Sequence, residues 1–289
     1  MQFTISAFST ALFSTWVFIE ELGLLFDAGD GVAAALMQKS RKANHLFFSH
    51  PDRDHLGGIL QLYQLNAREG KPTIGYPKDS GSFPALERFV SQFDPQSGPA
   101  TWLPLDDGQT IKIGGKRQVT AIRNGHIVST PASVKSLSYL VTEDRSQLKA
   151  EFQGLTGEGI ANLRRQHGDA YVLNIERKPM LGFSGDTPAL EPDVWLGVPV
   201  LIHECTFLKQ EDTRGQHSHL EQVLEASRFL PLEHLILTHF SSRYSHADIQ
   251  EAVTETANRL DIRFNIFLVL PGETARDILN QAPVWAPSR

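Results

Sequence analysis

The sequence predicts an α/β protein in which two β-sheets pack against each other and helices cover their outer faces. In the first half of the chain, short apolar runs typical of strands alternate with stretches in which apolar residues have helical spacing. The second half restarts the same pattern, and no long linker, low-complexity tract or repeat separates the two halves. We therefore expect a single domain over residues 1–289, built from two similar halves.

The first half contains the expected elements in a regular order. Three strands, a helix and a short buried strand are expected at 2–8, 16–20, 22–29, 31–43 and 45–49. A helix from about His55 to Ala67 follows and ends where Gly70 and Pro72 stop it. The remaining elements are a strand, an amphipathic helix and two strands, expected at 72–77, 83–93, 110–115 and 118–124.

The second half begins with a strand at 136–143. The interval 148–168 predicts a helical insert that its glycines interrupt. Residues 170–177 and 178–187 are expected to pair as the two strands of a hairpin. The last strands and the two helices between them are expected at 198–207, 234–240 and 266–272, and at 219–230 and 247–260.

Composition excludes several classes of protein. The chain has 289 residues, of which 41% are hydrophobic, enough for a sizeable core, and its net charge of −6 provides no global basic field for nucleic acid. A single cysteine, Cys205, allows no internal disulfide and suits a reducing compartment. Residues 1–26 are apolar, but they contain no Lys or Arg and include Glu20 and Glu21. This segment therefore resembles neither a signal peptide nor a membrane span, and we expect a cytoplasmic protein with no membrane partner.

The stretch HLFFSHPDRDHLGGIL, at 45–60, gathers groups that bind metals. Its apolar start brings His50 to a strand end, and the following proline favours an extended conformation there. Asp52, Asp54 and His55 can converge with His50 from one tight loop, and imidazole and carboxylate are ligands for Zn, Mn or Fe. The alternative is a polar loop whose aspartates cap the next helix, which does not account for four such groups in six residues.

Further candidate residues lie at the ends of apolar, strand-like runs or in turns beside glycine, where a rigid scaffold presents functional side chains. They are His126, Asp186, His203 with Glu204, His217 and His239. Any one of these histidines alone is more simply interpreted as a hydrogen-bonded residue of the core or surface. Together with the loop at 50–55, they provide enough nitrogen and oxygen donors for two metal ions.

These motifs resemble those of the metallo-β-lactamase superfamily, whose HxHxDH signature is similar to SHPDRDHLGG at 49–58. Four further motifs narrow the resemblance to the ribonuclease Z branch, also called tRNase Z or zinc phosphodiesterase: FDAGDG, GDT, HECTF and LTHFSSRY. The resemblance runs from about Asp27 to Tyr244. It implies an αββα sandwich of two mixed β-sheets with helices on the outside, the metallo-β-lactamase fold, with two metals at one edge between the sheets.

The resemblance implies that seven residues hold two divalent metal ions. The first ion would have His50, Asp52 and His126, the second would have Asp54, His55 and His239, and Asp186 would bridge the pair.

The resemblance also implies roles in the reaction. Asp54 would orient the nucleophile, and His203 with Glu204, and His217, match proton-shuttle motifs near the leaving group. Asp27 matches a position that supports the metal loop. Members of the branch are commonly dimers, so a homodimer is one expected assembly.

Asp52 departs from the usual pattern of the family, which has a histidine at that position. The aspartate adds a negative charge on a shorter side chain, which should raise the pKa of a bridging water. It also favours Mn or Fe at the first site, although zinc is the first expectation for the pair. Some branches of the fold resemble this HxDxDH version, and a site that holds only the second metal is the alternative.

Such a site is expected to cleave a phosphodiester, either at an RNA 3′ end or in a smaller molecule. Two features of this sequence differ from the corresponding features of the branch members that process tRNA. The PTxxRN-like motif of the branch is not recognisable in residues 8–20, and the interval 148–168 is expected to form no long, protruding basic arm. The sequence therefore supports the reaction class more strongly than it supports pre-tRNA as the substrate.

Three alternatives remain open. A cyclic-nucleotide phosphodiesterase is the nearest, because related enzymes of that class have similar motifs. A lactonase or thioesterase is the second, since the fold hosts several hydrolyses, but those enzymes have no counterpart of HECTF and His217. The third is a non-catalytic binding protein, which should lack metal ligands, whereas all seven positions here carry competent donors.

Overall fold

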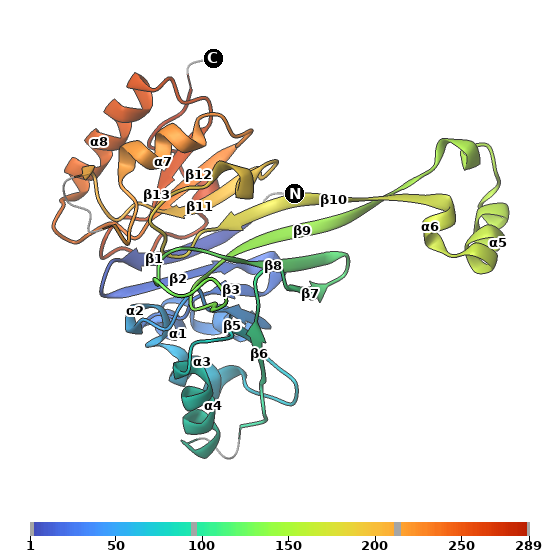
Figure 1. The fold of residues 1–289 in the computed structure, drawn as a ribbon, viewed down its shortest axis with the longest axis horizontal. Helices are drawn as coiled ribbons and strands as arrows, with labels where there is room; N and C mark the ends of the chain where they lie inside the picture. Colours follow the sequence, from blue (N-terminus) through green and yellow to red (C-terminus); the bar gives the residue numbers. More distant parts are fainter. Residues whose placement is uncertain (1–2, 94–96, 211–214, 288–289) are drawn as a thin grey trace.

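The computed structural model describes residues 3–93, 97–210 and 215–287. Residue 2, at which the first expected strand begins, lies outside these ranges. Two mixed β-sheets pack against each other, and helices lie on their outer sides (Figure 1). The prediction of an α/β sandwich with outer helices is therefore confirmed.

The first sheet has six strands in chain order. They are β1 (Ile5–Thr10), β2 (Ser14–Ile19), β3 (Leu24–Phe26), β4 (His45–Phe47), β5 (Thr73–Pro77) and β6 (Thr101–Leu105). β1, β2 and β3 are antiparallel to one another in turn, and β3 to β6 are parallel. The helices of this half are α1 (Val32–Leu36), α2 (Arg53–Leu56), α3 (Ile59–Asn66) and α4 (Ser82–Phe93).

Three elements of this half differ from the prediction. Strand β6 was not expected, and the helix expected at 31–43 is the short α1 followed by a 3₁₀ helix at Met37–Lys42. The single helix expected from His55 to Ala67 is divided into α2 and α3. The division falls at Gly57 and Gly58, where the chain packs tightly against a neighbouring loop. A Cβ atom on Gly58 would lie 2.3 Å from the carbonyl oxygen of Gly29, so only glycine allows this approach.

The second sheet has seven strands in the order β13-β12-β11-β10-β9-β8-β7. They are β7 (Thr110–Gly114), β8 (Arg117–Arg123), β9 (Leu137–Leu148), β10 (Leu173–Phe183), β11 (Val200–Glu204), β12 (His234–Thr238) and β13 (Asn265–Leu268). Strands β10 to β13 are parallel, and the others are antiparallel. Helices α7 (Leu220–Ser227) and α8 (His246–Arg259) belong to this half. Short 3₁₀ helices lie at Glu20–Leu22, Met37–Lys42, Ala150–Phe152, Pro192–Trp195 and Ile278–Asn280.

The main core lies between the two sheets, because strands present alternate side chains to opposite faces. In this layer the ring of Phe26 stacks on Phe183 at 4.7 Å and on Tyr139 at 5.6 Å between centroids. The alternate residues of the second sheet, including Leu201 and Leu235, pack in a separate cluster with α7 and α8. This packing fixes the strand ends, and so the loops that follow them.

Strands β9 and β10 continue beyond the sheet as a two-stranded arm that carries α5 (Gly157–His167) and α6 (Asp169–Val172) (Figure 1). The expectation that this interval forms no protruding arm is therefore wrong. Residues 170–177 and 178–187 do not form a hairpin either, because 173–183 is one strand that pairs with β9. The register shifts between Pro179 and Leu181, and such a bulge accommodates a proline that has no N–H to donate.

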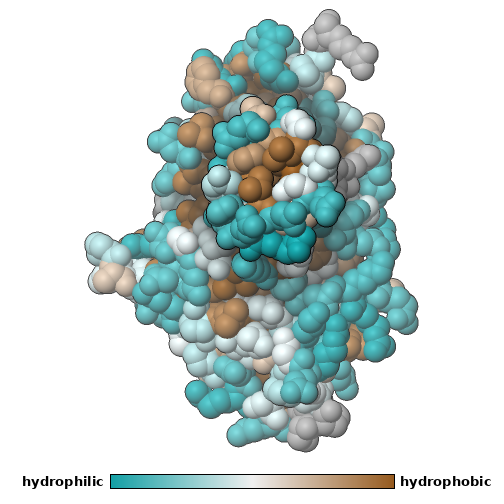
Figure 2. All heavy atoms as spheres, turned by 90° about the vertical axis from the view of Figure 1, so that its right-hand side faces the viewer, coloured by the Kyte–Doolittle hydropathy of each residue, from teal (hydrophilic) through white to brown (hydrophobic). Residues whose placement is uncertain are grey.

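The tip of the arm is partly apolar. Figure 2 views the molecule from the side to which the arm points, and hydrophobic side chains there are surrounded by hydrophilic ones. Leu155 and Tyr171 are 45% and 46% exposed. Among the described residues, no helix is long and apolar enough to cross a membrane.

Candidate metal centre

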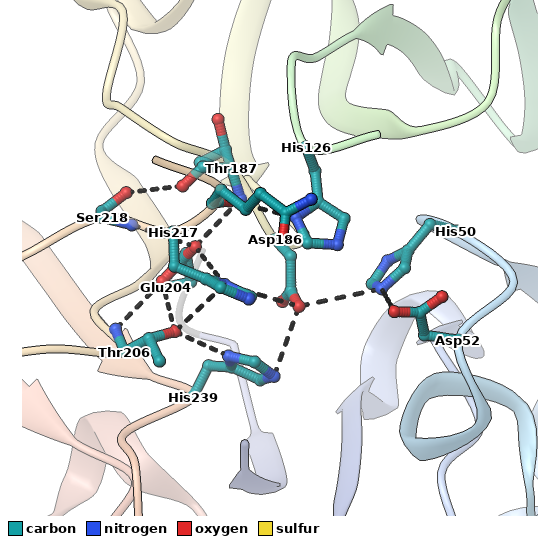
Figure 3. A network of polar contacts seen from close by, with 12 residues as sticks. His50, Asp52, His126, Asp186, Thr187, Glu204, Thr206, His217, Ser218 and His239 are labelled. Atoms are coloured by element: carbon teal, nitrogen blue, oxygen red, sulfur yellow. Dashed lines mark hydrogen bonds and ion pairs between the residues drawn. The ribbon is translucent and has the colours of Figure 1, made fainter. Parts of the chain in front are cut away.

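The predicted metal ligands lie in four segments, each of which follows a strand of the sandwich. The loop after β4 carries His50 and Asp52, and helix α2 directly after it carries Asp54 and His55. His126, Asp186 and His239 follow β8, β10 and β12. The structure brings all seven together, in overlapping groups whose ligand atoms lie within 4.8 Å of one another. Figure 3 shows Asp186 between His50 on one side and His239 on the other.

The carboxylate of Asp186 lies at the middle of the cluster. Its Oδ2 atom is 3.4 Å from Nε2 of both His55 and His239, and 3.7 Å from Nε2 of His50. These three Nε2 atoms are buried and have no hydrogen-bond partner among the described residues. Buried polar atoms are normally paired, so three unpaired imidazole nitrogens around one carboxylate fit divalent metal ions.

His50 and His55 each use the other ring nitrogen, Nδ1, in a hydrogen bond. Nδ1 of His55 donates to Oδ2 of Asp27 at 2.8 Å. Nδ1 of His50 donates to Oγ of Ser49 at 2.9 Å, and that hydroxyl donates to Asp27 at 2.8 Å. Burial raises the pKa of Asp27, although the charge of His55 and the hydrogen bonds oppose this. One buried carboxylate thus fixes the tautomer and direction of two imidazoles, which agrees with the supporting role expected for Asp27.

The histidines of the second sheet are held in the same way. Nδ1 of His126 donates to the carbonyl oxygen of Gln216 at 3.0 Å. Nδ1 of His239 donates to Oγ1 of Thr206 at 2.9 Å, and Thr206 Oγ1 donates to Glu204 at 2.7 Å (Figure 3). In both histidines Nδ1 carries the proton, so Nε2 is the nitrogen available as a metal ligand.

The buried Glu204 and the partly buried His217 form an ion pair beside the cluster. Oε1 of Glu204 accepts from Nδ1 of His217 at 3.0 Å, and its Oε2 accepts from the backbone N–H of Thr206 at 2.9 Å. Burial lowers the pKa of His217, but the hydrogen bond and charge of Glu204 outweigh it and raise the pKa above its usual value. Burial raises the pKa of Glu204, and the hydrogen bond and charge of His217 bring it below its usual value. The pair therefore favours a protonated imidazole next to an ionised carboxylate.

The structure separates His203 from this group, although the sequence placed it with Glu204. The two residues are neighbours on β11, so their side chains point to opposite faces of the sheet. Nδ1 of His203 donates to the carbonyl oxygen of Glu204 at 2.7 Å, and the ring borders a cavity of about 20 Å³ that Asn124 and Trp195 also line. Among the described residues, His203 belongs to none of the groups that could hold a metal ion.

Asp52 is the most loosely held of the seven residues. Its side chain is 60% exposed, and Oδ2 is 3.7 Å from Nε2 of His50. It precedes α2, but its side chain makes no capping hydrogen bond to a described residue. The interpretation of this aspartate as a helix cap therefore finds no support in the contacts.

Sequence reasoning missed three supporting contacts. Thr206 belongs to the HECTF motif, but no function was predicted for its hydroxyl. Ser9 was not predicted to take part in the site, although its Oγ accepts from the backbone N–H of His239 at 2.9 Å. The backbone N–H of Leu12 donates to Oδ2 of Asp54 at 3.0 Å. A main-chain donor can be supplied by any residue other than proline, so sequence cannot reveal it.

Solved structures identify the class of fold. The metallo-β-lactamase fold protein YhfI from Bacillus subtilis matches with a TM-score of 0.60 at 13% identity, covering 95% of this chain and 100% of that one. Human tRNase Z, short form, matches with a TM-score of 0.57 at 18% identity, covering 83% of this chain and 93% of that one. The chain has the metallo-β-lactamase fold.

Relatives in sequence narrow the class. No family model matches the chain. The chain is 25% identical to the chloroplastic tRNase Z TRZ2 of Arabidopsis thaliana over 279 residues, covering 91% of this chain and 74% of that protein. It is 26% identical to ribonuclease Z of Marinobacter nauticus over 251 residues, covering 77% of this chain and 76% of that protein. The predicted resemblance is confirmed, and the chain is a metal-dependent hydrolase that resembles ribonuclease Z.

Proposed function

We propose that this chain is a binuclear phosphodiesterase that cleaves RNA near its 3′ end. The observation that carries the proposal is the convergence of three buried, unpaired Nε2 atoms on the carboxylate of Asp186, at 3.4–3.7 Å. Leaving such atoms without a partner is unfavourable, and two divalent ions would satisfy all of them. The relatives named ribonuclease Z or tRNase Z support the reaction and the class of substrate.

The seven clustered residues would divide between two ions as the resemblance implies. His50, Asp52 and His126 would hold the first, Asp54, His55 and His239 the second, and Asp186 both. When bound, such a pair supplies charge stabilisation for the phosphodiester and a nucleophile at neutral pH. Zinc is the first choice for this pair, and the exposed carboxylate of Asp52 would make Mn or Fe competitive at the first position.

The residues beside the ions would direct the nucleophile and move the proton. Asp54 is held by the backbone N–H of Leu12, so its carboxylate is oriented before substrate binds. His217, kept protonated by Glu204, would donate a proton to the departing alkoxide. We assign no direct part in this transfer to His203, because its ring lies on the other face of the sheet.

The arm formed by β9, β10, α5 and α6 supports RNA as the substrate (Figure 1). Its supposed absence was one of two reasons for doubting pre-tRNA, and that reason no longer holds; the other, the unrecognisable PTxxRN-like motif in residues 8–20, is unchanged. The charges on the arm are mixed, however, since Arg164 pairs with Asp169 at 2.7 Å and Arg177 with Asp144 at 2.9 Å. We propose 3′-extended pre-tRNA as the first substrate to test.

A hydrolysis screen with Mn²⁺ or Zn²⁺ tests the function. It compares 3′-extended pre-tRNA, bis-p-nitrophenyl phosphate, cyclic nucleotides and a lactone. We expect cleavage of pre-tRNA and of bis-p-nitrophenyl phosphate. Exclusive cleavage of cyclic nucleotides would establish the nearest alternative, and cleavage of the lactone alone would reject a phosphodiesterase.

We further propose that residues 1–289 act as a single catalytic domain in the cytoplasm and assemble as a homodimer. The single cysteine, Cys205, is buried and unpaired, which suits a reducing compartment. The homodimer follows only from the resemblance. Light scattering coupled to size exclusion measures the mass and tests it.

A further inference from the structure

The turn between β1 and β2 exposes two large apolar side chains, Leu12 at 88% and Phe13 at 64%. Leu12 also has a backbone φ of +70°, a left-handed conformation that a bulky side chain disfavours. Strained and exposed positions of this kind persist when the surrounding structure imposes them, and they concentrate at functional sites. The turn lies in residues 8–20, the segment in which the PTxxRN-like motif is not recognisable.

The turn is hydrogen-bonded to two segments that carry candidate metal ligands. The backbone N–H of Leu12 donates to Oδ2 of Asp54 at 3.0 Å, and that of Ala11 donates to the carbonyl oxygen of Phe240, the residue after His239, at 3.3 Å. Phe13 therefore follows directly after a residue that contacts the centre.

Phe13 also forms one side of a pocket of about 450 Å³. Phe8, Tyr244 and Pro271 contribute further apolar surface, while Thr10 and His246 contribute polar groups. A pocket of this size takes a small organic group, and its mixture of rings and hydrogen-bonding groups suits a planar heterocycle. The turn that carries Phe13 therefore lines this pocket and also, through the backbone N–H of Leu12, contacts Asp54.

We propose that Phe13 and this pocket bind the nucleobase of a nucleotide that flanks the scissile phosphodiester, so that Phe13 is a specificity-determining residue. The inference rests on the proposed function, because it takes the reacting phosphate to lie at the metal centre. Stacking on an aromatic ring accepts every base, since each has a π-face, and so gives preference for nucleotides over other phosphodiesters.

The test compares two phosphodiesters that share a leaving group: thymidine 5′-(p-nitrophenyl phosphate), which has a base, and methyl p-nitrophenyl phosphate, which has none. The measured quantity is the ratio of their kcat/KM values on the full chain with added Mn²⁺. We expect Phe13→Ala to lower this ratio about tenfold, within the range that loss of one stacked base produces. Phe13→Trp should keep the ratio, because it keeps a stacking surface.

The matched control is Phe229→Ala, which removes a phenylalanine that is 77% exposed after α7, outside the site. It should leave the ratio unchanged. An unchanged ratio in Phe13→Ala overturns the inference while the proposed function stands.

If the wild-type protein cleaves neither ester, the ratio has no value; the pre-tRNA screen then decides the proposed function, and binding decides the inference separately. Titration calorimetry then compares adenosine 5′-monophosphate with ribose 5-phosphate. We expect the nucleotide to bind at least fivefold more tightly, and Phe13→Ala to remove the difference. Equal affinities in the wild-type protein overturn the inference.

Discussion

Single hydroxyl groups decide how the imidazoles of the metal centre are aimed. Thr206 Oγ1 accepts from Nδ1 of His239 and donates to Oε2 of Glu204, so it connects a predicted metal ligand with the predicted proton shuttle. In the same way, Ser49 Oγ accepts from Nδ1 of His50 and donates to Asp27. In both cases a neutral side chain sets the tautomer of a histidine, and its removal leaves a buried ring nitrogen without a partner.

Thr206→Val should therefore lower kcat/KM for bis-p-nitrophenyl phosphate and weaken metal binding, each about 10- to 100-fold, because valine keeps the shape and removes the hydroxyl. Thr206→Ser keeps the hydroxyl and should stay within about threefold of the wild type in both. Kinetics and metal titration measure the two effects. Wild-type values for the valine variant would show that this hydroxyl does not orient His239.

The two histidines predicted for proton transfer are expected to behave differently. His217→Asn should lower kcat about 100-fold or more, the usual effect of losing a general acid. His203→Asn should lower kcat less than tenfold, because the His203 ring faces the cavity beside Asn124 and not the cluster. Steady-state kinetics on bis-p-nitrophenyl phosphate measures both variants. A larger loss of kcat in His203→Asn would indicate that His203 does take part in the proton transfer.

Asp52 is the one predicted ligand that departs from the family pattern, and its exposed side chain can be replaced without disturbing the core. Asp52→His removes a negative charge and adds an imidazole, so the ratio of zinc-supported to manganese-supported activity should rise about tenfold. Parallel assays of the metal-free protein with each ion measure the ratio. An unchanged ratio would indicate that Asp52 does not contact the first ion.

Among the elements, the buried strands gave the clearest signal in the sequence. β11 and β12 are entirely or almost entirely buried, and their apolar runs identified them as strands. The outer parts of β9 and β10 are largely solvated, as the exposure of Ile175 at 55% illustrates. The outer part of β9 was therefore not predicted, and the strand expected at 170–177 was assigned the wrong partner. The division between α2 and α3 depends on the contact of Gly58 with Gly29, which is a tertiary effect.

The arm should be separable from the catalytic centre, because α5 has no buried residue. Ser146 pairs with Ile175, so an Asn-Gly turn in place of residues 147–174 closes the shortened hairpin. We expect cleavage of 3′-extended pre-tRNA to fall about 100-fold or more and hydrolysis of bis-p-nitrophenyl phosphate to stay within about twofold. Equal losses on both substrates would mean that the arm supports the centre rather than the RNA.

At the scale of the whole molecule, the candidate site joins the two halves of the sandwich. His50, Asp54 and His55 come from the loop and helix α2 that follow β4 of the first sheet, and Asp186 and His239 come from loops of the second. The sequence identified these residues because strand ends and metal-binding side chains leave a recognisable pattern. It could not show which side chains face one another across the sheets, and so it grouped His203 with the residues that meet there.

Because its ligands come from both sheets, bound metal should stabilise the whole fold. At a free ion concentration of about 100 times the dissociation constant, binding adds about 2.7 kcal/mol, which for a chain of this length raises Tm by about 5 °C. Differential scanning calorimetry of the protein with Mn²⁺ or Zn²⁺, and after treatment with a chelator, measures the difference. Asp186→Asn should reduce that difference to less than about 2 °C, since the side chain at the middle of the cluster then carries no charge. A protein that melts at the same temperature with and without metal would contradict a site shared by the two sheets.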